Sequence, residues 1–510
     1  MTNGNAADYF VDRHVRDGRG DKTAFVETGG NTLTYGELAG QSDCMADLFA
    51  RHGISREDRI AMLVFDTLKF PTIFWGGLKA GVVPVCMNTL LATDVYRVML
   101  EDSRAKALFV SAALYPVIEP LLEAVSHLSM VFVIGDEPPA GTLCFADELA
   151  KCRPKKMLDC VGDESAFWLY SSGSTGQPKG VRHVHSSLKE TSDTYGAKVL
   201  GINEDDTIFS AAKLFFAYGL GNGMTFPMSV GATAILMSGR PTPDSVIDVL
   251  ETHKPSIFAG VPTLYAALVA ELKMRSKLDC TLRRCISAGE ALPEDIGRRW
   301  EDITGTEILD GVGSTEMLHI FLSNAPGDVV YGTSGIAVPG YDVRLVDEAG
   351  AKPGHGEVGE MLVRGGSAAS DYWNQRAKSR DTFEGNWTRT GDKYEQRKDG
   401  RYVYCGRTDD MFKVSGIWVS PFEVEQAIVS HPAVLEAAVV AARDEDGLEK
   451  PKAFIVLNKG QSDNDLTDAL REHVKERIGK WKYPRWFEFF DELPKTATGK
   501  IQRFKLRDGV

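Results

Sequence analysis

The sequence predicts an α/β fold with a large first domain and a small α+β domain at the end of the chain. Short apolar runs typical of buried strands alternate with amphipathic stretches over the first several hundred residues, which indicates parallel sheets covered by helices. Strands dominate from about residue 335 to 404 and predict a β-rich subdomain. A compact α+β pattern follows, so we place a domain boundary near Arg407.

The predicted elements follow one another in a regular order. Residues 59–65 ("RIAMLVF") are a predicted buried strand, and residues 71–81 a predicted helix, because that segment begins with Pro and ends with Gly. In the last domain a helix begins at Pro421, and an apolar residue at every fourth position over 466–478 predicts another. Further strands are predicted at residues 82–88, 106–111, 130–135, 232–237, 255–260, 283–289, 341–347, 359–365, 401–406, 434–442 and 452–457.

Composition narrows the functional class. The formal net charge of −13 argues against nonspecific nucleic-acid binding, and no apolar window is long enough to span a membrane. The first residues lack the basic and apolar regions of a secretory signal. The eight cysteines are scattered without a C-x-x-C pair, and no His cluster has metal-ligand spacing. These features predict a cytoplasmic protein with reduced thiols.

A loop rich in glycine and hydroxyl residues follows a predicted strand at residues 166–170. Gly173, Gly176 and Gly180 allow backbone N–H groups to turn together toward an anion, and Lys179 adds a cation. Hydroxyl donors come from Ser171, Ser172, Ser174 and Thr175. The Walker pattern is absent, because Gly and Val follow Lys179 where Ser or Thr would hold magnesium. The loop therefore predicts phosphate binding outside the P-loop class, and a flexible linker is the alternative.

The segment "SSGSTGQPKG" (171–180) resembles the signature of the adenylate-forming superfamily, which includes acyl-CoA synthetases, adenylation domains of peptide synthetases and beetle luciferases. Four other motifs of that superfamily follow in the same order: "GSTE" (313–316), "TGD" (390–392), "GRTDDMFKVSG" (406–416) and "PKTATGK" (494–500). Within the superfamily, "KLFFAYGLGNG" (213–223) and "GSTEMLHIFLSN" (313–324) look most similar to benzoate–CoA ligases.

This resemblance implies a large N-terminal domain of two α/β subdomains and a β-barrel over residues 1–406. It also implies a small mobile α+β domain over residues 407–510 that turns about the hinge residue Asp409. The reaction would join a carboxylate to the α-phosphate of ATP, release pyrophosphate, and pass the acyl group to a thiol.

The resemblance also assigns catalytic and nucleotide-binding residues. The predicted catalytic residues are Lys500, Glu316, Thr175 and Lys179, of which Thr175 and Glu316 would position Mg²⁺. Asp392 and Arg407 would approach the ribose, and Asp310 the adenine amino group. Val312 stands where many relatives carry an aromatic residue that stacks on adenine. The full predicted ATP/AMP set is Ser171, Ser172, Gly173, Ser174, Thr175, Gly176, Lys179, Ala288, Gly289, Glu290, Asp310, Gly311, Val312, Gly313, Ser314, Thr315, Asp392, Arg407 and Lys500.

Considered alone, several of these residues have an ordinary structural interpretation. Glu316 is also consistent with a surface acid in a loop, Asp392 with a turn aspartate after glycine, and Lys500 with a solvated lysine. The ordered set of motifs favours the functional interpretation of each.

By the same resemblance, the acid pocket is lined by Ala217, Tyr218, Gly313, His319 and Ile320. Core packing is the alternative for the aromatic run, although its three glycines are poor residues for a core helix. His319 has two interpretations: a histidine with satisfied partners in a polar rim, or a contact to the ligand. Coenzyme A would pass Ser415, Gly416, Ile417 and Trp418.

The resulting prediction is a cytoplasmic aryl–CoA ligase of the benzoate type that uses ATP, Mg²⁺ and coenzyme A in aromatic compound degradation. Three alternatives stay open: preference for a hydroxybenzoate or an alicyclic acid, loading of a carrier protein, and nucleotide sensing without catalysis. Acetylation of Lys500 by a protein acetyltransferase, reversed by a deacetylase, would remove a charge and switch the enzyme off. The sequence does not indicate an oligomeric state.

Overall fold

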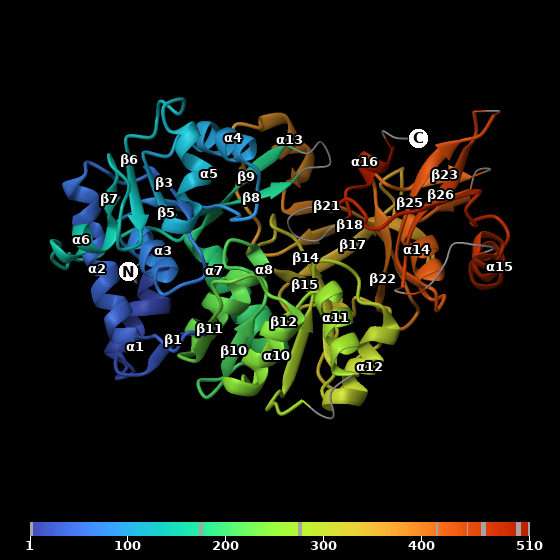
Figure 1. Ribbon diagram of the computed structural model, residues 1–510, viewed down its shortest axis with the longest axis horizontal. Helices are drawn as coiled ribbons and strands as arrows, with labels where there is room; N and C mark the ends of the chain where they lie inside the picture. Colours follow the sequence, from blue (N-terminus) through green and yellow to red (C-terminus); the bar gives the residue numbers. More distant parts are fainter. Residues whose placement is uncertain are drawn as a thin grey trace. The chain divides into compact units, whose positions relative to one another are not determined.

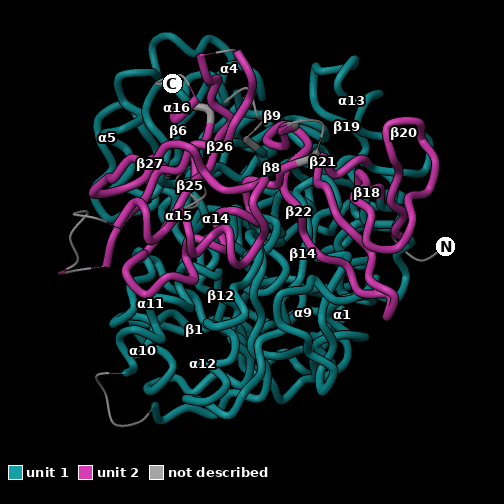
Figure 2. The backbone as a smooth tube through the Cα atoms, turned by 90° about the vertical axis from the view of Figure 1, so that its right-hand side faces the viewer, with its two compact units in different colours: residues 1–342, 363–388 teal, residues 343–362, 389–510 magenta. Residues whose placement is uncertain are grey.

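A computed structural model describes residues 4–172, 177–273, 278–414, 417–445, 447–458, 460, 466–495 and 501–507 (Figure 1). The chain forms two compact units, coloured separately in Figure 2. Unit 1 comprises Met1–Asp342 and Val363–Thr388, and unit 2 comprises Val343–Leu362 and Arg389–Val510. The two units are divided at other residues than the predicted domain boundary near Arg407, which stays a prediction.

One sheet of unit 1 has the strand order β19-β9-β8-β4-β3-β5-β6-β7. Its strands from β8 to β7 are parallel to their neighbours, and β9 and β19 continue the sheet antiparallel. The predicted strands at 59–65, 82–88, 106–111 and 130–135 are confirmed. The bounds are β3 Arg59–Leu63, β4 Val83–Cys86, β5 Ala107–Ser111, β6 Met130–Ile134, β7 Leu143–Cys144, β8 Ser165–Ser172, β9 Pro178–Val184 and β19 Asp371–Tyr372.

Another sheet of unit 1 has the order β16-β15-β14-β13-β12-β10-β11-β1-β2. The strands from β14 to β1 are parallel, with antiparallel strands at both edges. The bounds are β1 Thr23–Glu27, β2 Thr32–Thr34, β10 Thr207–Ser210, β11 Thr233–Leu236, β12 Ile257–Gly260, β13 Arg284–Ser287, β14 Ile308–Gly313, β15 Ile320–Ser323 and β16 Ile336–Ala337.

Helices accompany these strands, as the alternating pattern predicted. The helix predicted over 71–81 begins two residues earlier, because Pro71 takes the third position of the first turn, where a missing N–H breaks no helical bond. The α-helices of unit 1 are α1 Arg13–Arg16, α2 Tyr35–Arg51, α3 Lys69–Lys79, α4 Thr93–Ser103, α5 Tyr115–Ile118, α6 Phe145–Ala150, α7 His185–Thr191, α8 Ala217–Leu220, α9 Phe226–Val230, α10 Pro243–Thr252, α11 Pro262–Leu272, α12 Glu294–Thr304 and α13 Arg376–Thr382. Short π and 3-10 segments are η1 Asp8–Asp12, η2 Ala112–Leu114, η3 Glu119–Leu121, η4 Ser192–Leu200 and η5 Gly221–Thr225.

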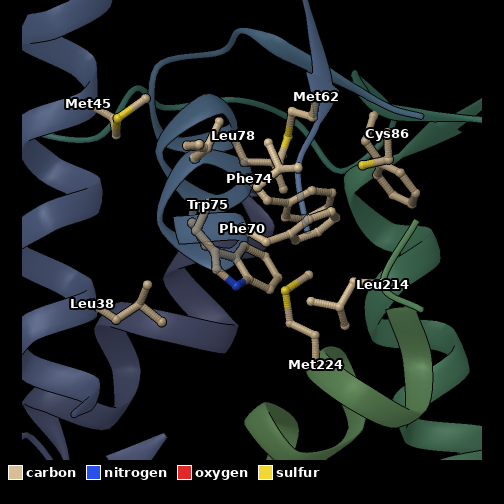
Figure 3. Close-up of a cluster of buried hydrophobic side chains, with 14 of the residues drawn as sticks. Leu38, Met45, Met62, Phe70, Phe74, Trp75, Leu78, Cys86, Leu214 and Met224 are labelled. Atoms are coloured by element: carbon tan, nitrogen blue, oxygen red, sulfur yellow. The ribbon is translucent and has the colours of Figure 1, made fainter. Parts of the chain in front are cut away.

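The core of unit 1 gathers around α3. Figure 3 shows aromatic side chains of α3 between residues of α2 on one side and of the segment near α8 on the other. The rings of Phe74 and Trp75 meet edge to face, with centroids 5.1 Å apart, and both side chains are fully buried. Leu214 and Met224 reach the same cluster, so the segment predicted to contain the acid pocket is attached to this core.

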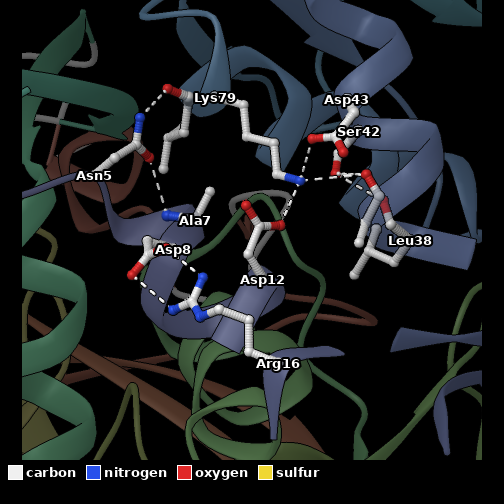
Figure 4. A network of polar contacts seen from close by, with 11 residues as sticks. Asn5, Ala7, Asp8, Asp12, Arg16, Leu38, Ser42, Asp43 and Lys79 are labelled. Carbon is white, nitrogen blue, oxygen red and sulfur yellow. Dashed lines mark hydrogen bonds and ion pairs between the residues drawn. The ribbon is translucent and has the colours of Figure 1, made fainter. Parts of the chain in front are cut away.

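A buried ion pair lies at the end of α3. The Lys79 side chain has no exposed surface, and its Nζ lies 2.6 Å from both Asp12 Oδ1 and Asp43 Oδ1 (Figure 4). Nζ also donates a hydrogen bond of 3.2 Å to the carbonyl oxygen of Ala39. The ammonium group therefore holds the start of the chain, α2 and α3 together.

Unit 2 contains most of the sheet formed by β17, β18, β21 and β22, which is the predicted β-rich region. It also contains the predicted α+β pattern, which in its described residues comprises the sheet β25-β26-β27, the hairpin β23-β24 and the helices α14, α15 and α16. The bounds are β17 Asp342–Val346, β18 Val358–Arg364, β21 Trp387–Gln396, β22 Tyr402–Arg407, β23 Phe412–Val414, β24 Ile417–Val419, α14 Pro421–Val429, β25 Val434–Arg443, β26 Glu449–Leu457, α15 Leu466–Ile478, β27 Trp486–Phe489 and α16 Arg503–Arg507, with β20 Phe383–Glu384 belonging to unit 1. Within the described ranges, every helix is too short or too polar to cross a bilayer.

Substitution of Lys79 by Met should destabilise unit 1 by about 3 kcal/mol, because it leaves two partly buried carboxylates without their cation. Urea denaturation followed by tryptophan fluorescence measures this change. Lys254→Met is the matched control, since Lys254 pairs with the exposed Asp279, and we expect less than about 1 kcal/mol there. Equal effects of the two substitutions would show that the buried pair contributes no more than a surface pair.

Candidate active site

The predicted phosphate loop joins β8 to β9 in unit 1. Ser171 pairs with Lys179 and Ser172 with Pro178 across this hairpin, so the two ends of the loop are held by the sheet. Gly173, Ser174, Thr175 and Gly176 lie outside the described residues. The position of the loop directly beyond a parallel strand is the place where ligands bind in α/β sheets.

Glu316 lies beside the flanks of this loop. Its Oε1 is 3.4 Å from the hydroxyl of Ser171 and 3.9 Å from Lys179 Nζ. Both charged side chains are mostly buried, with 12% of Lys179 and 16% of Glu316 exposed. The structure therefore brings together three residues that the sequence had predicted from motifs about 140 positions apart.

Tyr372 of β19 completes this cluster, and sequence reasoning missed it. Its hydroxyl donates a 2.8 Å hydrogen bond to Glu316 Oε1, and Lys179 Nζ lies 4.5 Å from the centre of its ring. The residues "DYW" (371–373) belong to none of the quoted motifs, so the contact with Glu316 could not be predicted from them.

The described residues fit a magnesium site that is completed by phosphate. No group of three or more His, Cys, Asp or Glu side chains that could hold a metal lies together in the described part of the chain. Magnesium needs only one or two carboxylates besides phosphate oxygens and waters. Glu316, a hard oxygen donor next to the flanks of the predicted phosphate loop, would supply one, whereas the other predicted ligand, Thr175, lies outside the described residues.

The predicted adenine site lies at the ends of β13 and β14, which are parallel neighbours. Ala288 directly follows β13 and is buried, Gly289 has a φ of +99°, and Glu290 is exposed. Asp310 of β14 is buried, and burial raises the pKa of its carboxyl to about 8, partly opposed by a hydrogen bond from the Leu292 N–H. Among the described residues its Oδ1 has no partner, as expected of an acceptor for an amino group.

The glycines of β14 have a packing role. A Cβ atom at Gly313 would lie 2.4 Å from the carbonyl oxygen of His319, and one at Gly311 would lie 2.7 Å from that of Leu322. Both therefore allow β15 to approach β14, and Val312 lies half-buried between them. The following turn is closed by Ser314, whose hydroxyl accepts from the Met317 N–H, and by Thr315, whose carbonyl accepts from the Leu318 N–H.

The predicted acid pocket begins at α8, where Ala217 and Tyr218 are half-buried. The Tyr218 hydroxyl lies within hydrogen-bond distance of two carbonyl oxygens, those of Gly260 at 3.0 Å and Ile286 at 3.1 Å. Phe215 packs in the main core, so the packing interpretation holds for part of this aromatic run. Ile320, in β15, is buried opposite Gly313.

His319 is buried among the rings of Tyr195, Tyr218 and Phe226. Burial lowers the pKa of its imidazole to about 3, so the side chain is neutral at physiological pH. Its Nε2 lies 3.3 Å from the Tyr218 carbonyl oxygen and 3.3 Å from Asn222 Nδ2. Nδ1 has no partner among the described residues. The contacts of Nε2 thus agree with a histidine whose partners are satisfied, whereas Nδ1 is available to a ligand.

Asn222 and Gly221 lie against His319. Gly221 is one of the three glycines noted in the aromatic run, whereas Asn222 was not among the predicted site residues. Asn222 is fully buried and contacts both His319 and the Tyr218 carbonyl oxygen. A Cβ atom at Gly221 would lie 2.4 Å from His319 Cδ2, so glycine makes room for the imidazole. Both residues lie almost a hundred positions before His319, and only the fold reveals the contact.

In unit 2, the predicted ribose-binding residues are neighbours. Asp392 and Arg407 are paired across β21 and β22, and Arg407 Nη1 donates to Asp392 Oδ1 at 2.9 Å. Gly391 has a φ of +72°, and a Cβ there would lie 2.8 Å from the Arg407 guanidinium. The glycine of "TGD" therefore lets the arginine reach the aspartate.

The predicted hinge residue Asp409 lines a cavity of about 280 Å³ in unit 2. Its carbonyl oxygen accepts from Arg507 Nη1 at 3.2 Å, and Arg507 also pairs with Asp410 at 2.7 Å. Among the predicted coenzyme A residues, the backbones of Ile417 and Trp418 form β24. Ser415, Gly416 and Lys500 lie outside the described residues.

Comparison with known proteins agrees with this arrangement. Residues 11–373 match the family of AMP-binding enzymes, and residues 423–500 match the AMP-binding enzyme C-terminal domain. A 4-hydroxybenzoate–CoA/benzoate–CoA ligase of Rhodopseudomonas palustris is 53% identical over 99% of this chain and 94% of its own length. A benzoate–CoA ligase of Thauera aromatica is 52% identical over 99% and 95%, respectively. A solved benzoate CoA ligase from Burkholderia xenovorans LB400 has a TM-score of 0.91 and 48% identity, covering 99% of this chain and 100% of that one.

The raised pKa of Asp310 predicts a pH-dependent stability. Between about pH 4 and pH 8 the folded protein retains a proton that the unfolded chain has released, so the free energy of unfolding falls as the pH rises through this window. Asp310→Asn should remove this fall. Its free energy of unfolding, relative to that of the wild type, should therefore rise by at least ~1.4 kcal/mol from pH 5 to pH 8. Urea denaturation at both pH values measures it. Asp295→Asn, at an exposed position of α12, should change the pH dependence little, and an identical result for the two variants would contradict the prediction.

Proposed function

The chain belongs to the family of AMP-binding enzymes, and on this basis we propose that it is an ATP-dependent benzoate–CoA ligase. The observation that carries this proposal is the match of 52–53% identity over nearly the whole chain with two enzymes named for benzoate. The proposed products are the aryl thioester of coenzyme A, AMP and pyrophosphate.

In the first half-reaction, a carboxylate oxygen of benzoate attacks the α-phosphorus of ATP, and the bond to pyrophosphate breaks. Ser171 and Lys179 would hold the β- and γ-phosphates, because a hydroxyl donor and an ammonium group face the place where charge accumulates. Glu316 would hold Mg²⁺, which neutralises phosphate charge when bound. Lys500 would contact the carboxylate and the α-phosphate.

On the adenosine side, Asp310 Oδ1 would accept from the adenine amino group beside Ala288, Gly289 and Glu290. Val312 would cover the ring face where many relatives use an aromatic residue. In unit 2, Asp392 would accept hydrogen bonds from the ribose hydroxyls, and Arg407 would fix the orientation of that carboxylate through their 2.9 Å hydrogen bond.

The acid would bind in the pocket of Ala217, Tyr218, Gly313, His319 and Ile320. The neutral His319 and the hydrogen-bonded Tyr218 hydroxyl present little charge to an aromatic ring. In the second half-reaction, the thiol of coenzyme A attacks the acyl carbon and AMP leaves. The thiol arm would pass residues 415–418 after residues 407–510 have turned about Asp409.

4-Hydroxybenzoate is the second candidate acid. The Rhodopseudomonas relative is named for both acids, and His319 Nδ1 has no partner among the described residues, so it is available to a ring hydroxyl. A site that hydrogen-bonds a hydroxyl can strongly reject the analogue lacking it, whereas an apolar wall separates the two acids by only ~1–3 kcal/mol. Because ATP and coenzyme A are cytoplasmic substrates, we place the enzyme in the cytoplasm.

An acid panel tests this function and the pocket together. We expect the wild-type enzyme to form benzoyl-CoA from benzoate, ATP and coenzyme A, as detected by mass spectrometry, and to discriminate against alicyclic acids. Ala217→Phe fills the pocket and should lower kcat/KM for benzoate at least about 100-fold, while Mg·ATP binding persists. Val161→Phe, at an exposed position, is the control. Full activity of Ala217→Phe with benzoate would show that Ala217 does not line the pocket. If the aryl group were found only on a carrier protein, that protein and not coenzyme A would be the acceptor.

Substitution of Lys500 by Ala should separate the two half-reactions. Adenylate formation gathers negative charge and needs a cation, so we expect it to fall by at least about 100-fold. Conversion of supplied benzoyl-AMP and coenzyme A to the thioester should continue near the wild-type rate. The two rates are measured as pyrophosphate release and thioester formation. Acetylation of Lys500 should reproduce the pattern, whereas a parallel loss of both rates would exclude Lys500 as the adenylation lysine.

A further inference from the structure

A contact that none of the predicted motifs contains joins Tyr372 to the charged pair beside the phosphate loop. The Tyr372 side chain is buried, with 4% of the residue exposed, and its hydroxyl donates to Glu316 Oε1 at 2.8 Å. The ammonium group of Lys179 lies over its ring, 4.5 Å from the centre. One side chain thus contacts both the carboxylate and the cation.

The distance between the two charged groups makes this contact significant. Lys179 Nζ and Glu316 Oε1 are 3.9 Å apart, longer than the 2.7–2.9 Å of a charge-assisted hydrogen bond. In a mostly buried place, a lysine and a glutamate attract each other strongly and would be expected to form a direct pair. Tyr372 competes with that pair on both sides, because its hydroxyl stabilises the carboxylate and its ring face stabilises the ammonium.

Several independent contacts fix Tyr372 in this place. β19 pairs with β9, so that Tyr372 lies opposite Val181, and the Trp373 N–H donates to the Gly180 carbonyl oxygen at 2.8 Å. Arg182 of β9 makes two hydrogen bonds of 2.6 Å to Asp371. The neighbouring Trp373 donates from its indole to the Asp102 carbonyl oxygen at 2.9 Å.

The same segment is also attached to the Glu316 turn. The Ala369 N–H donates to the Glu316 carbonyl oxygen at 2.8 Å, and the Ser367 hydroxyl donates to the Met317 carbonyl oxygen at 2.8 Å. The backbone of residues 367–373 therefore spans from the Glu316 turn to the strand that leaves the phosphate loop. Tyr372 is the side chain that this span places between Glu316 and Lys179.

We propose that Tyr372 is a positioning residue that keeps Glu316 and Lys179 apart, so that the carboxylate can bind a divalent cation while the ammonium binds phosphate. A direct Lys179–Glu316 pair would neutralise both groups before Mg·ATP arrives. The inference rests on the proposed nucleotide chemistry of this site and adds a residue with a defined role to it.

The test is the binding of Mg·ATP measured by calorimetry, without acid and without coenzyme A. Tyr372→Phe retains the ring and removes only the hydroxyl. We expect it to weaken Mg·ATP binding about tenfold, the equivalent of one hydrogen bond to a charged group. Binding of ATP in the presence of a chelator should change less than about twofold, because Lys179 keeps its aromatic partner.

A double-mutant cycle separates positioning from general damage. Glu316→Gln should weaken Mg·ATP binding, and addition of Tyr372→Phe to that variant should have little further effect, because the hydroxyl acts through the carboxylate. Tyr170→Phe is the matched control: it removes a hydroxyl that donates to Asp102 at 2.8 Å in the neighbouring part of the same sheet, and Mg·ATP binding should not change. Tyr372→Leu removes the ring as well and should also weaken ATP binding in chelator.

Each of three outcomes would overturn the inference. Tyr372→Phe could bind Mg·ATP as tightly as the wild type, or the losses of the two single variants could multiply in the double variant. The third is that Tyr372→Phe loses affinity equally with and without magnesium. These outcomes are separable from failure of the proposed function. A wild-type protein that binds Mg·ATP but forms no aryl thioester would overturn the proposed acid class and leave the role of Tyr372 intact. A wild-type protein that does not bind Mg·ATP would overturn both.

Discussion

The hydrogen-bonded register of β9 between β8 and β19 is the constraint on which the candidate phosphate site depends. On one side it fixes Lys179 opposite Ser171, and on the other it fixes Tyr372 opposite Val181. A strand shifted by one residue would turn every side chain to the other face of the sheet. The bidentate contact of Arg182 with Asp371 opposes such a shift, because it exists in only one register. Lys179 and Tyr372, almost two hundred positions apart, are thereby held in contact.

Burial determines the protonation of the groups around the predicted adenine and acid pockets. Desolvation disfavours the charged form of both Asp310 and His319, which raises the pKa of the acid and lowers that of the base. Near pH 7 the carboxyl is therefore mainly protonated and the imidazole deprotonated, so both side chains are mainly uncharged. Lys179 and Glu316 lie in a different setting, where an opposite charge and a tyrosine are within contact distance. The mainly uncharged side chains thus belong to the predicted adenine and acid pockets, and the charged ones to the predicted phosphate and metal site.

Most of the fold could be predicted from the sequence, because buried parallel strands are continuous apolar runs and the helices between them carry clear ends. The strands at 59–65 and 106–111 are examples. The helix predicted over 71–81 begins and ends two residues earlier, and its start differs because Pro71 is tolerated anywhere in a first turn. The motif residues Glu316 and Lys179 could be named in advance from local spacing. Tyr372 and Asn222 could not, because their contacts join distant segments. Tyr372 lies outside the quoted motifs, and nothing within "KLFFAYGLGNG" distinguishes Asn222 from its neighbours. The roles of all the predicted site residues remain predictions, and residues 173–176, 415–416 and 500 lie outside the described part of the chain.

The close approach of β15 to β14 has a consequence for how substrate preference can diverge. The backbone of His319 requires glycine at position 313, and its imidazole requires glycine at position 221. Both requirements hold whatever acid occupies the pocket. The Tyr218 hydroxyl is likewise committed to the carbonyl oxygens of Gly260 and Ile286. Random mutagenesis at these three positions should yield mainly unfolded protein, whereas Ala217 is a half-buried residue at the edge of the main core. A lineage or a laboratory that selects for a new acid therefore has few adjustable positions, and substitutions at residue 217 should recur in independent selections.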